Sequence, residues 1–238
     1  MDNKQIPIGK TSKIIGVSID TLRRWDKSGK LPALRHSPSG NRYYLQSDIE
    51  SLLNDPSIAR QWAFNLIPGT PPANFHCRTR DAFQSRLENL QYKLTKSIGI
   101  KTSSLITAVA GEIGNNSFDH NLGNWPDIFG IFFSFTPSKK IILADRGRGI
   151  LATLQRVEPT LKTHAQALTL AFTKTISGRS PEVRGNGLKF VKNVVTSHSL
   201  KLSFQTGNAL LELSEEETQV NVKIVQETIR GCFVIIEY

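Results

Sequence analysis

The chain has 238 residues, 39% of them hydrophobic, which suits one large domain or two smaller ones, and its two distant cysteines, Cys77 and Cys232, suggest neither a disulfide framework nor a zinc site. No apolar run is long enough to span a bilayer, and the first ten residues lack the apolar stretch of a secretory signal, so we expect a cytoplasmic protein with no membrane partner. Thirty Lys and Arg against twenty Asp and Glu give a net charge of +10, and residues 1–100 hold most of the excess, with 15 basic and 8 acidic side chains.

The first predicted elements are two short helices. KTSKIIGVS, residues 10–18, predicts a helix that ends at Gly16, where glycine favours a left-handed cap. Ser18 is a good N-cap for a second helix over 18–29, SIDTLRRWDKSG. A small shared core is expected from Ile14, Ile15, Val17, Leu22 and Trp25. Two helices joined by a tight turn predict a helix-turn-helix, whose second helix would expose Thr21, Arg23 and Arg24.

A hairpin is predicted next. Residues 29–53 contain two extended segments around a Ser-Pro-Ser-Gly turn, followed by a helix that begins at Ser47. The side chains expected to line this wing are Arg35, His36, Asn41 and Arg42, with Tyr43 or Tyr44 beside them. Basic and amide groups at a hairpin tip suit contact with phosphates and with the minor groove.

TLRRWDKSGKLP (21–32) and GNRYYLQSDI (40–49), in this order and spacing, resemble the MerR-like winged helix-turn-helix family and its excisionase-type relatives over residues 6–53. The resemblance implies binding to double-stranded DNA, with the second helix in the major groove, the wing against the backbone, and a homodimer that reads two half-sites. The alternative is a small helical domain used for protein contact.

A linker is predicted where NLIPGTPPANF, residues 65–75, brings three prolines and a glycine. We expect a DNA-binding domain at 1–62, a linker at 63–78 and a second domain at 79–238. The second domain would begin with an amphipathic helix over 79–97, whose apolar stripe, Phe83, Leu87, Leu90 and Leu94, is either a core face or a docking surface.

The helix predicted around VAGEIGNNSFDHN, residues 109–121, is unusually polar. Glu112, Asn116 and His120 follow one another at four-residue spacing, so they lie along one stripe, while Val109, Ile113 and Phe118 would hold the helix to a core. An amide oxygen can bind Mg²⁺, and a carboxylate one turn away could orient or deprotonate a nucleophile. Such a stripe is also compatible with an ordinary solvent-exposed face.

Two glycine pairs follow. A buried strand over 139–145 runs into Asp145, Gly147 and Gly149, where the carboxylate could accept a hydrogen bond from an amine such as that of adenine. Within 182–198, Gly185 and Gly187 precede a helix whose first amide groups would attract phosphate. Either glycine pair alone is a weak signal, because turns commonly need glycine.

The remaining segments predict a sheet and a lid. Strands are expected at 127–135, 139–145, 199–207, 208–214, 219–225 and 231–238. The turn TGNA (206–209) would join two of them as a hairpin. Between the glycine pairs, residues 151–184 predict helix followed by a lid rich in hydroxyl and basic side chains.

Glu112…Asn116…His120, then Asp145-x-Gly-x-Gly, then Gly185-x-Gly-Leu resemble in their order the GHKL ATPase superfamily, over about residues 80–238. The spelling E-x-x-x-N-x-x-x-H is closest to the serine-kinase branch that acts as anti-sigma factors. The resemblance implies an α+β chain whose second domain is a Bergerat α/β sandwich, with a mixed sheet, helices on one face, and the cofactors ATP and Mg²⁺.

The resemblance also implies roles for individual residues. Glu112 would be catalytic and Asn116 would hold Mg²⁺, while Asp145 would bind adenine. The other ATP contacts would come from His120, Gly147, Gly149, Lys174, Arg179, Arg184, Gly185, Gly187 and Leu188. His120 could instead make a structural hydrogen bond, and the three basic residues could belong to an ordinary loop. The segment 79–97 contains no histidine, so autophosphorylation of the two-component kind is not expected.

Three functions remain open. The first is a DNA-bound regulator whose state changes with the nucleotide. The second is a protein serine/threonine kinase that acts on a small phosphoacceptor or a sigma or anti-anti-sigma-like partner, with a plain ATPase that releases phosphate without any acceptor as an intermediate case. The third is a non-catalytic dimerisation module gated by ATP.

Overall fold

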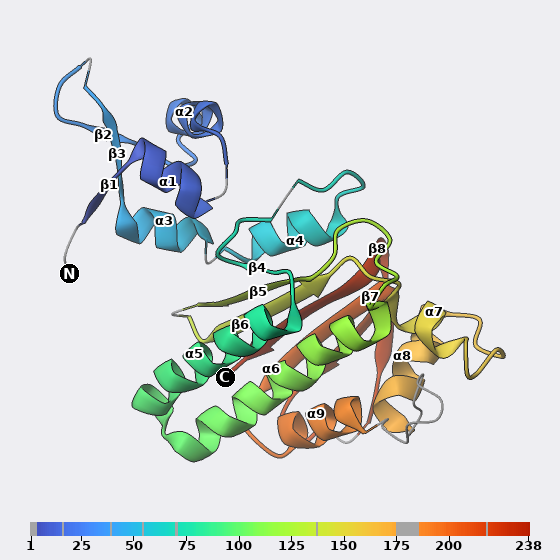
Figure 1. The fold of residues 1–238 in the computed structure, drawn as a ribbon. Helices are drawn as coiled ribbons and strands as arrows, with labels where there is room; N and C mark the ends of the chain where they lie inside the picture. The colour runs from blue at the N-terminus through green and yellow to red at the C-terminus, as the bar shows by residue number, and fades with distance from the viewer. Residues whose placement is uncertain are drawn as a thin grey trace.

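The computed structural model describes residues 4–15, 17–38, 40–53, 55–69, 71–136, 138–174, 186–217 and 219–238. Figure 1 shows a small amino-terminal unit above a larger unit of helices packed on a sheet. The α+β class expected from the sequence is therefore confirmed.

The amino-terminal unit is a helix-turn-helix with a wing. It contains β1 (Gln5–Pro7), α1 (Ile8–Ile15), α2 (Ile19–Ser28), β2 (Leu34–Arg35), β3 (Arg42–Leu45) and α3 (Gln46–Leu53), and its antiparallel sheet has the order β1-β3-β2. Ser18 caps α2 by accepting from the amide of Thr21, as predicted. The predicted helix start at Ser47 differs by one residue from the observed start at Gln46. Gly16, the predicted cap of the first helix, lies outside the described residues.

The apolar side chains predicted for this unit do form its core. Ile15 and Leu22 are buried in one cluster, against which Ile14, Val17 and Trp25 pack. Tyr44 is buried and its hydroxyl donates to the carbonyl of Leu22. Tyr43, rather than Tyr44, is therefore the tyrosine available at the surface of the wing.

The larger unit is built on a five-stranded sheet of order β4-β5-β6-β8-β7 (Figure 1). Its strands are β4 (His76–Cys77), β5 (Ile131–Thr136), β6 (Lys140–Asp145), β7 (Lys201–Leu213) and β8 (Val222–Glu237). One face is covered by α5 (Arg80–Ile98), α6 (Ile100–Asn121), α8 (His164–Thr173) and α9 (Gly187–Thr196), while α7 (Gly149–Leu154) packs beside α8.

The sheet is buried on both faces near its centre. Because successive side chains on a strand point to opposite faces, Phe133 and Leu143 join the core under α5 and α6, whereas Phe132 and Ala144 join a second core. This second core lies under α4 (Pro56–Phe64) on the opposite face. The predicted stripe of the 79–97 helix is a core face, since all four of its apolar residues are buried within α5.

Three expectations about the sheet are corrected. TGNA is not a hairpin turn: β7 runs through it as one strand with a bulge at Gly207, whose φ of 54° and contact with the His164 ring accommodate no side chain. Likewise, most of the two predicted strands 219–225 and 231–238 lies in one continuous strand, β8 (Val222–Glu237). Every pairing among the described strands of this sheet is antiparallel, whereas a mixed sheet was expected. β5 with β6, and β7 with β8, pair as neighbours in the sequence, which favours antiparallel pairing.

The segment predicted as a linker contributes to the larger unit. β4 pairs with β5, and α4, which precedes the prolines, packs its Ala59 and Trp62 on the sheet. We therefore propose that the first domain ends near residue 54, and that α4 belongs structurally to the second. No helix among the described residues combines the length and the apolar character that crossing a membrane requires.

Candidate functional site

The exposed surface of the helix-turn-helix carries the side chains predicted for α2. Arg23 and Arg24 are exposed and Thr21 is partly exposed, while Leu22 and Trp25 turn inward. Arg23 forms an ion pair with Asp20, and one guanidinium nitrogen of Arg24 donates to the Thr21 hydroxyl at 3.2 Å. The helix thus presents two arginines side by side to the solvent.

The wing arginines are held differently. Arg42 Nε and Arg35 Nη2 both donate to Oδ2 of Asp26, at 2.7 and 2.9 Å, and Asp26 lies on α2. These two side chains therefore fasten the wing to the second helix. The other predicted wing residues lie at the surface: His36 and Asn41 are exposed, and the His36 ring lies 5.1 Å from that of Tyr43.

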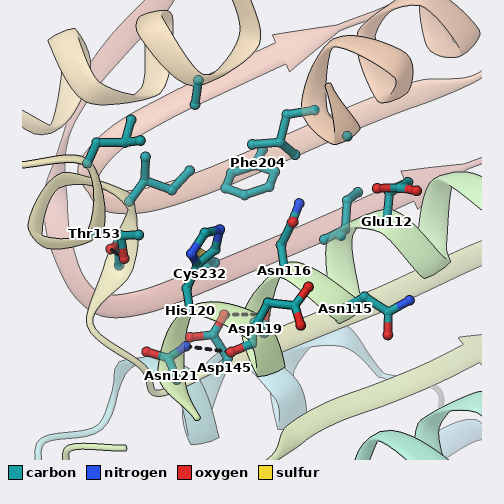
Figure 2. A pocket seen from close by; sticks show the side chains of 18 of the residues that line it. Glu112, Asn115, Asn116, Asp119, His120, Asn121, Asp145, Thr153, Phe204 and Cys232 are labelled. Carbon is teal, nitrogen blue, oxygen red and sulfur yellow. Dashed lines mark hydrogen bonds between the residues drawn. The ribbon is translucent and has the colours of Figure 1, made fainter. Parts of the chain in front are cut away.

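A cavity of about 500 Å³ lies between α6, α7 and α9, and its sheet side is lined by Asp145 at the end of β6, Phe204 of β7 and Cys232 of β8. The predicted residues that line it are Glu112, Asn116, His120, Asp145, Gly149, Gly187 and Leu188. Figure 2 shows Glu112, Asn116 and His120 spaced along one side of α6, with Phe204 and Cys232 facing them from the sheet. Three stretches far apart in the sequence therefore meet around one space.

Asp145 lies at the inner end of this cavity. It is 3% exposed, and it accepts hydrogen bonds from the Ser117 hydroxyl and from the amide of Gly147, both at 2.8 Å. Burial raises the pKa of Asp145, although hydrogen bonds from Ser117, Gly147 and Cys232 act in the opposite direction. The carboxyl group is thus fixed in orientation, with its environment favouring a partner that donates hydrogen bonds.

The opposite end of the cavity brings Glu112 against the start of α9. A Cβ on Gly187 would lie only 2.5 Å from Glu112 Oε2, so glycine is what allows this approach. Asn116 lies one turn further along α6, and its amide nitrogen would be 3.6 Å from the same Cβ. A carboxylate, an amide side chain and a helix N-terminus therefore converge here. The first amide groups of the helix have no acceptor within the helix, so they are able to bind an anionic group.

His120 lines the same cavity. Burial, with a smaller contribution from Arg156, lowers the pKa of His120, so the neutral imidazole is favoured at neutral pH. At the rim, Arg80 from α5 forms an ion pair with Asp119. Neither residue was assigned a role from the sequence, although both line the cavity.

Some predicted residues are not placed at the cavity. Lys174 follows α8 and lies beside Leu170 and Val222 in a separate shallow groove. Gly147 does not line the cavity but packs against Asn121, which does. A Cβ on Gly147 would lie 2.1 Å from the Asn121 side chain. Arg179, Arg184, Gly185 and most of the predicted lid lie outside the described residues.

Sequence reasoning missed several residues that build the site. Asn121 is buried, accepts from the amide of Arg148 and donates to the carbonyl of Ser117, each at 2.8 Å. Ser117 and Asn121 are also four residues apart, so a second polar stripe on the same helix could have drawn attention to them. Cys232 and Thr206 are cross-strand partners of β8 and β7, and no local pattern indicates that pairing.

The donor set around Asn116 fits a magnesium ion that keeps most of its water and phosphate ligands. Mg²⁺ in nucleotide sites takes only one or two protein oxygens, and an amide and a carboxylate are available here. Among the described residues no group of three or more His, Cys, Asp or Glu side chains could hold a metal by itself.

Comparison with known proteins gives matches of two kinds. Residues 7–44 match the family model described as MerR family regulatory protein. No curated protein matches the chain. Ninety chains of solved structures match, among them the topoisomerase IV ATP-binding domain of Francisella tularensis in complex with a small-molecule inhibitor, at 17% identity and a TM-score of 0.35. That match covers 55% of this chain and 35% of the other, so this chain spans about a third of the length of that structure.

Proposed function

We propose that this protein is a DNA-binding regulator whose second domain binds Mg·ATP in the cavity beside α6. The observation that carries the proposal is the convergence of Glu112, Asn116, Asp145 and Gly187 around one space of about 500 Å³. That volume is within the range of small-molecule sites. A fixed, buried carboxyl group at one end and a helix N-terminus at the other suit a ligand with an amine-bearing base and an anionic tail.

In this proposal Asp145 accepts from the exocyclic amine of adenine. Asn116 would hold Mg²⁺, and the first turn of α9 would receive the phosphates near Gly187 and Leu188, which line the cavity. His120, which also lines the cavity, would contact the sugar or a phosphate. When bound, Mg²⁺ would neutralise phosphate charge, and Glu112 would accept a proton from water or from an acceptor hydroxyl.

The first domain would bind double-stranded DNA. The match of residues 7–44 to the MerR family model supports this, as does the basic surplus of the amino-terminal half. Arg23 and Arg24, exposed on α2, are the expected groove contacts, with Thr21, His36, Asn41 and Tyr43 beside them. Arg35 and Arg42 would act mainly by holding the wing in place. A homodimer would present two such units to two half-sites.

A second candidate function is phosphoryl transfer to a small partner protein. The spelling E-x-x-x-N-x-x-x-H and the position of Glu112 against the start of α9 favour it. The phosphoacceptor, or a sigma or anti-anti-sigma-like partner, would meet the cavity at that end. Glu112→Ala should then abolish phosphate release or transfer while ATP binding persists.

A nucleotide titration tests the cavity. We expect ATP to bind roughly 10- to 100-fold more tightly than inosine triphosphate, which lacks the exocyclic amine, because a hydrogen bond to a charged group contributes about 1.5–3 kcal/mol. Asp145→Ala should lose ATP binding, whereas Asp81→Ala, which changes an exposed carboxylate at the start of α5, should not. Equal affinities of the wild type for the two nucleotides would exclude the role given to Asp145.

A further inference from the structure

Arg146 connects the proposed nucleotide cavity to the opposite face of the sheet. It directly follows Asp145, the last residue of β6. The Asp145 side chain accepts from Ser117 of α6, whereas the Arg146 side chain contacts the end of α4. Arg146 is 3% exposed, so nearly its entire side chain is enclosed between the sheet edge and α4. A buried guanidinium requires acceptors for its donors and a nearby counter-charge.

Both requirements are met by elements outside the cavity. Arg146 Nη1 donates to the carbonyls of Trp62 and Ala63, each at 2.9 Å. Both carbonyls lie in the last turn of α4, where carbonyl groups have no donor within the helix. Its Nε and Nη2 lie 2.9 and 2.8 Å from Oδ2 of Asp127. The bonds of Arg146 lower the pKa of Asp127, although partial burial alone would raise it. A positive charge at a helix C-terminus also interacts favourably with the helix dipole.

The residues on the cavity side of this segment are equally constrained. Asn121 of α6 holds the amide of Arg148, and Asp145 holds the amide of Gly147. The segment 145–148 is thus fixed to α6 on one side and to α4 on the other. A displacement of Asp145 by a ligand amine would be passed to Arg146 through the shared backbone and so to the end of α4.

Further contacts connect the core under α4 to the helix-turn-helix. The side chain of Phe75 packs both against the core under α4 and against the core of the first domain, and its ring stacks on Phe132 with centroids 5.2 Å apart. Asn74 Nδ2 donates to the carbonyl of Ile14 at 3.1 Å. The first domain therefore rests on the face of the sheet that α4 covers.

We propose that Arg146 is the positioning residue through which the nucleotide state of the cavity reaches α4 and the DNA-binding domain. This inference rests on the proposed function, because it assumes that the cavity takes a nucleotide and that the first domain takes DNA. The ligand does not touch Arg146, so the residue acts through the main chain of Asp145 and the carbonyls at the end of α4.

The test compares Arg146→Lys and Arg146→Gln with Arg230→Gln. Arg230 contacts the same carboxylate of Asp127 at 3.2 Å, but its side chain is 51% exposed, so it is a matched control. Lysine keeps the charge beside Asp127 while losing the planar fork that reaches two carbonyls, and it keeps the test usable if the glutamine variant fails to fold. Affinity for mixed-sequence duplex DNA is measured at one fixed salt concentration, with and without Mg²⁺ and a non-hydrolysable ATP analogue.

In the wild type we expect the analogue to change DNA affinity by about 5-fold or more, the usual lower range of coupling between sites. In the Arg146 variants the analogue should bind within about 3-fold of its wild-type affinity, whereas its effect on DNA affinity should fall to nearly none. Arg230→Gln should keep the wild-type coupling. Coupling that persists in both Arg146 variants would overturn the inference, as would a wild type that binds both ligands without coupling.

A second measurement needs no change at residue 146. With Trp25→Phe and Trp125→Phe, Trp62 is the remaining tryptophan of the three, and it lies on the α4 side of the sheet, away from the cavity. Adding the analogue should shift its emission if the end of α4 moves, and an unchanged emission at saturating analogue would contradict the proposed route. Absence of any analogue binding in a direct titration would instead refute the proposed function, and this inference with it.

Discussion

Asp26 offers the most quantitative test of how the DNA-binding domain is held together. Its carboxylate side chain is 12% exposed and accepts from Arg42, Arg35 and the amide of Ala33. Burial alone would raise the pKa of Asp26, but these hydrogen bonds lower it from 3.8 to about 2. A carboxyl group whose pKa is lowered on folding stabilises the folded state at pH values above its pKa in the unfolded chain. The decrease for Asp26 corresponds to roughly 2.5 kcal/mol at neutral pH.

Asp26→Asn keeps the size of the side chain and, with its oxygen at the Oδ1 position, the acceptor for Ala33, but it removes the charge together with the acceptor shared by Arg35 and Arg42. Because Arg35 is partly exposed and water screens its contribution, we expect the unfolding free energy of the first domain to fall by about 2 kcal/mol at pH 7. The difference from the wild type should shrink as pH falls through the carboxyl pKa, to roughly half near pH 3.

Urea unfolding followed by Trp25 fluorescence measures this, in a protein with Trp62 and Trp125 replaced by phenylalanine. Asp20→Asn is the matched control, since its carboxylate is 81% exposed and pairs with Arg23 on the same helix, and its effect should be far smaller. A difference between Asp26→Asn and the wild type that stays constant from pH 7 to pH 3 would refute the electrostatic reasoning. So would equal effects of the two substitutions.

Three further predictions concern the cavity. Asp145→Asn should raise the unfolding temperature of the nucleotide-free protein at pH 7, because burial penalises the charged carboxylate and raises its pKa. The gain should vanish as pH falls below about 3.8, and a gain that grows on acidification would contradict this reasoning. Gly147→Ala should lower the free energy of unfolding by about 2–4 kcal/mol, because the new Cβ would meet the buried side-chain amide of Asn121, which two hydrogen bonds hold in place. A double variant with Asn121→Ala should recover part of that loss, and strictly additive losses in thermal unfolding would exclude the clash. Gly187→Ala should lower the rate of phosphate release more than it lowers ATP affinity, because the new Cβ displaces the end of the Glu112 side chain. Steady-state kinetics that change only in KM would argue against a role of Glu112 as proton acceptor.

The sequence alone determined the two units, the main helices and one side of the cavity. The four-residue spacing of Glu112, Asn116 and His120 places them on one face of a helix whatever the rest of the chain does, because helix geometry is local. Ser18 marked a helix start for the same reason, since an N-cap acts on amides two or three residues away. The α+β class followed from the resemblance of three short motifs to a known superfamily, and the local alternation of apolar residues in the predicted strands is consistent with it.

Tertiary structure alone decided which residues complete the site. The pairing of Thr206 with Cys232 depends on the register between β7 and β8, and the bulge at Gly207 that sets this register resembled a turn in the sequence. The two hydrogen bonds from Arg146 to α4 join residues more than 80 positions apart, so no local pattern could indicate them. Whether a basic side chain is available to DNA or committed to a neighbour, as Arg35 and Arg42 are to Asp26, is also settled only when distant segments meet.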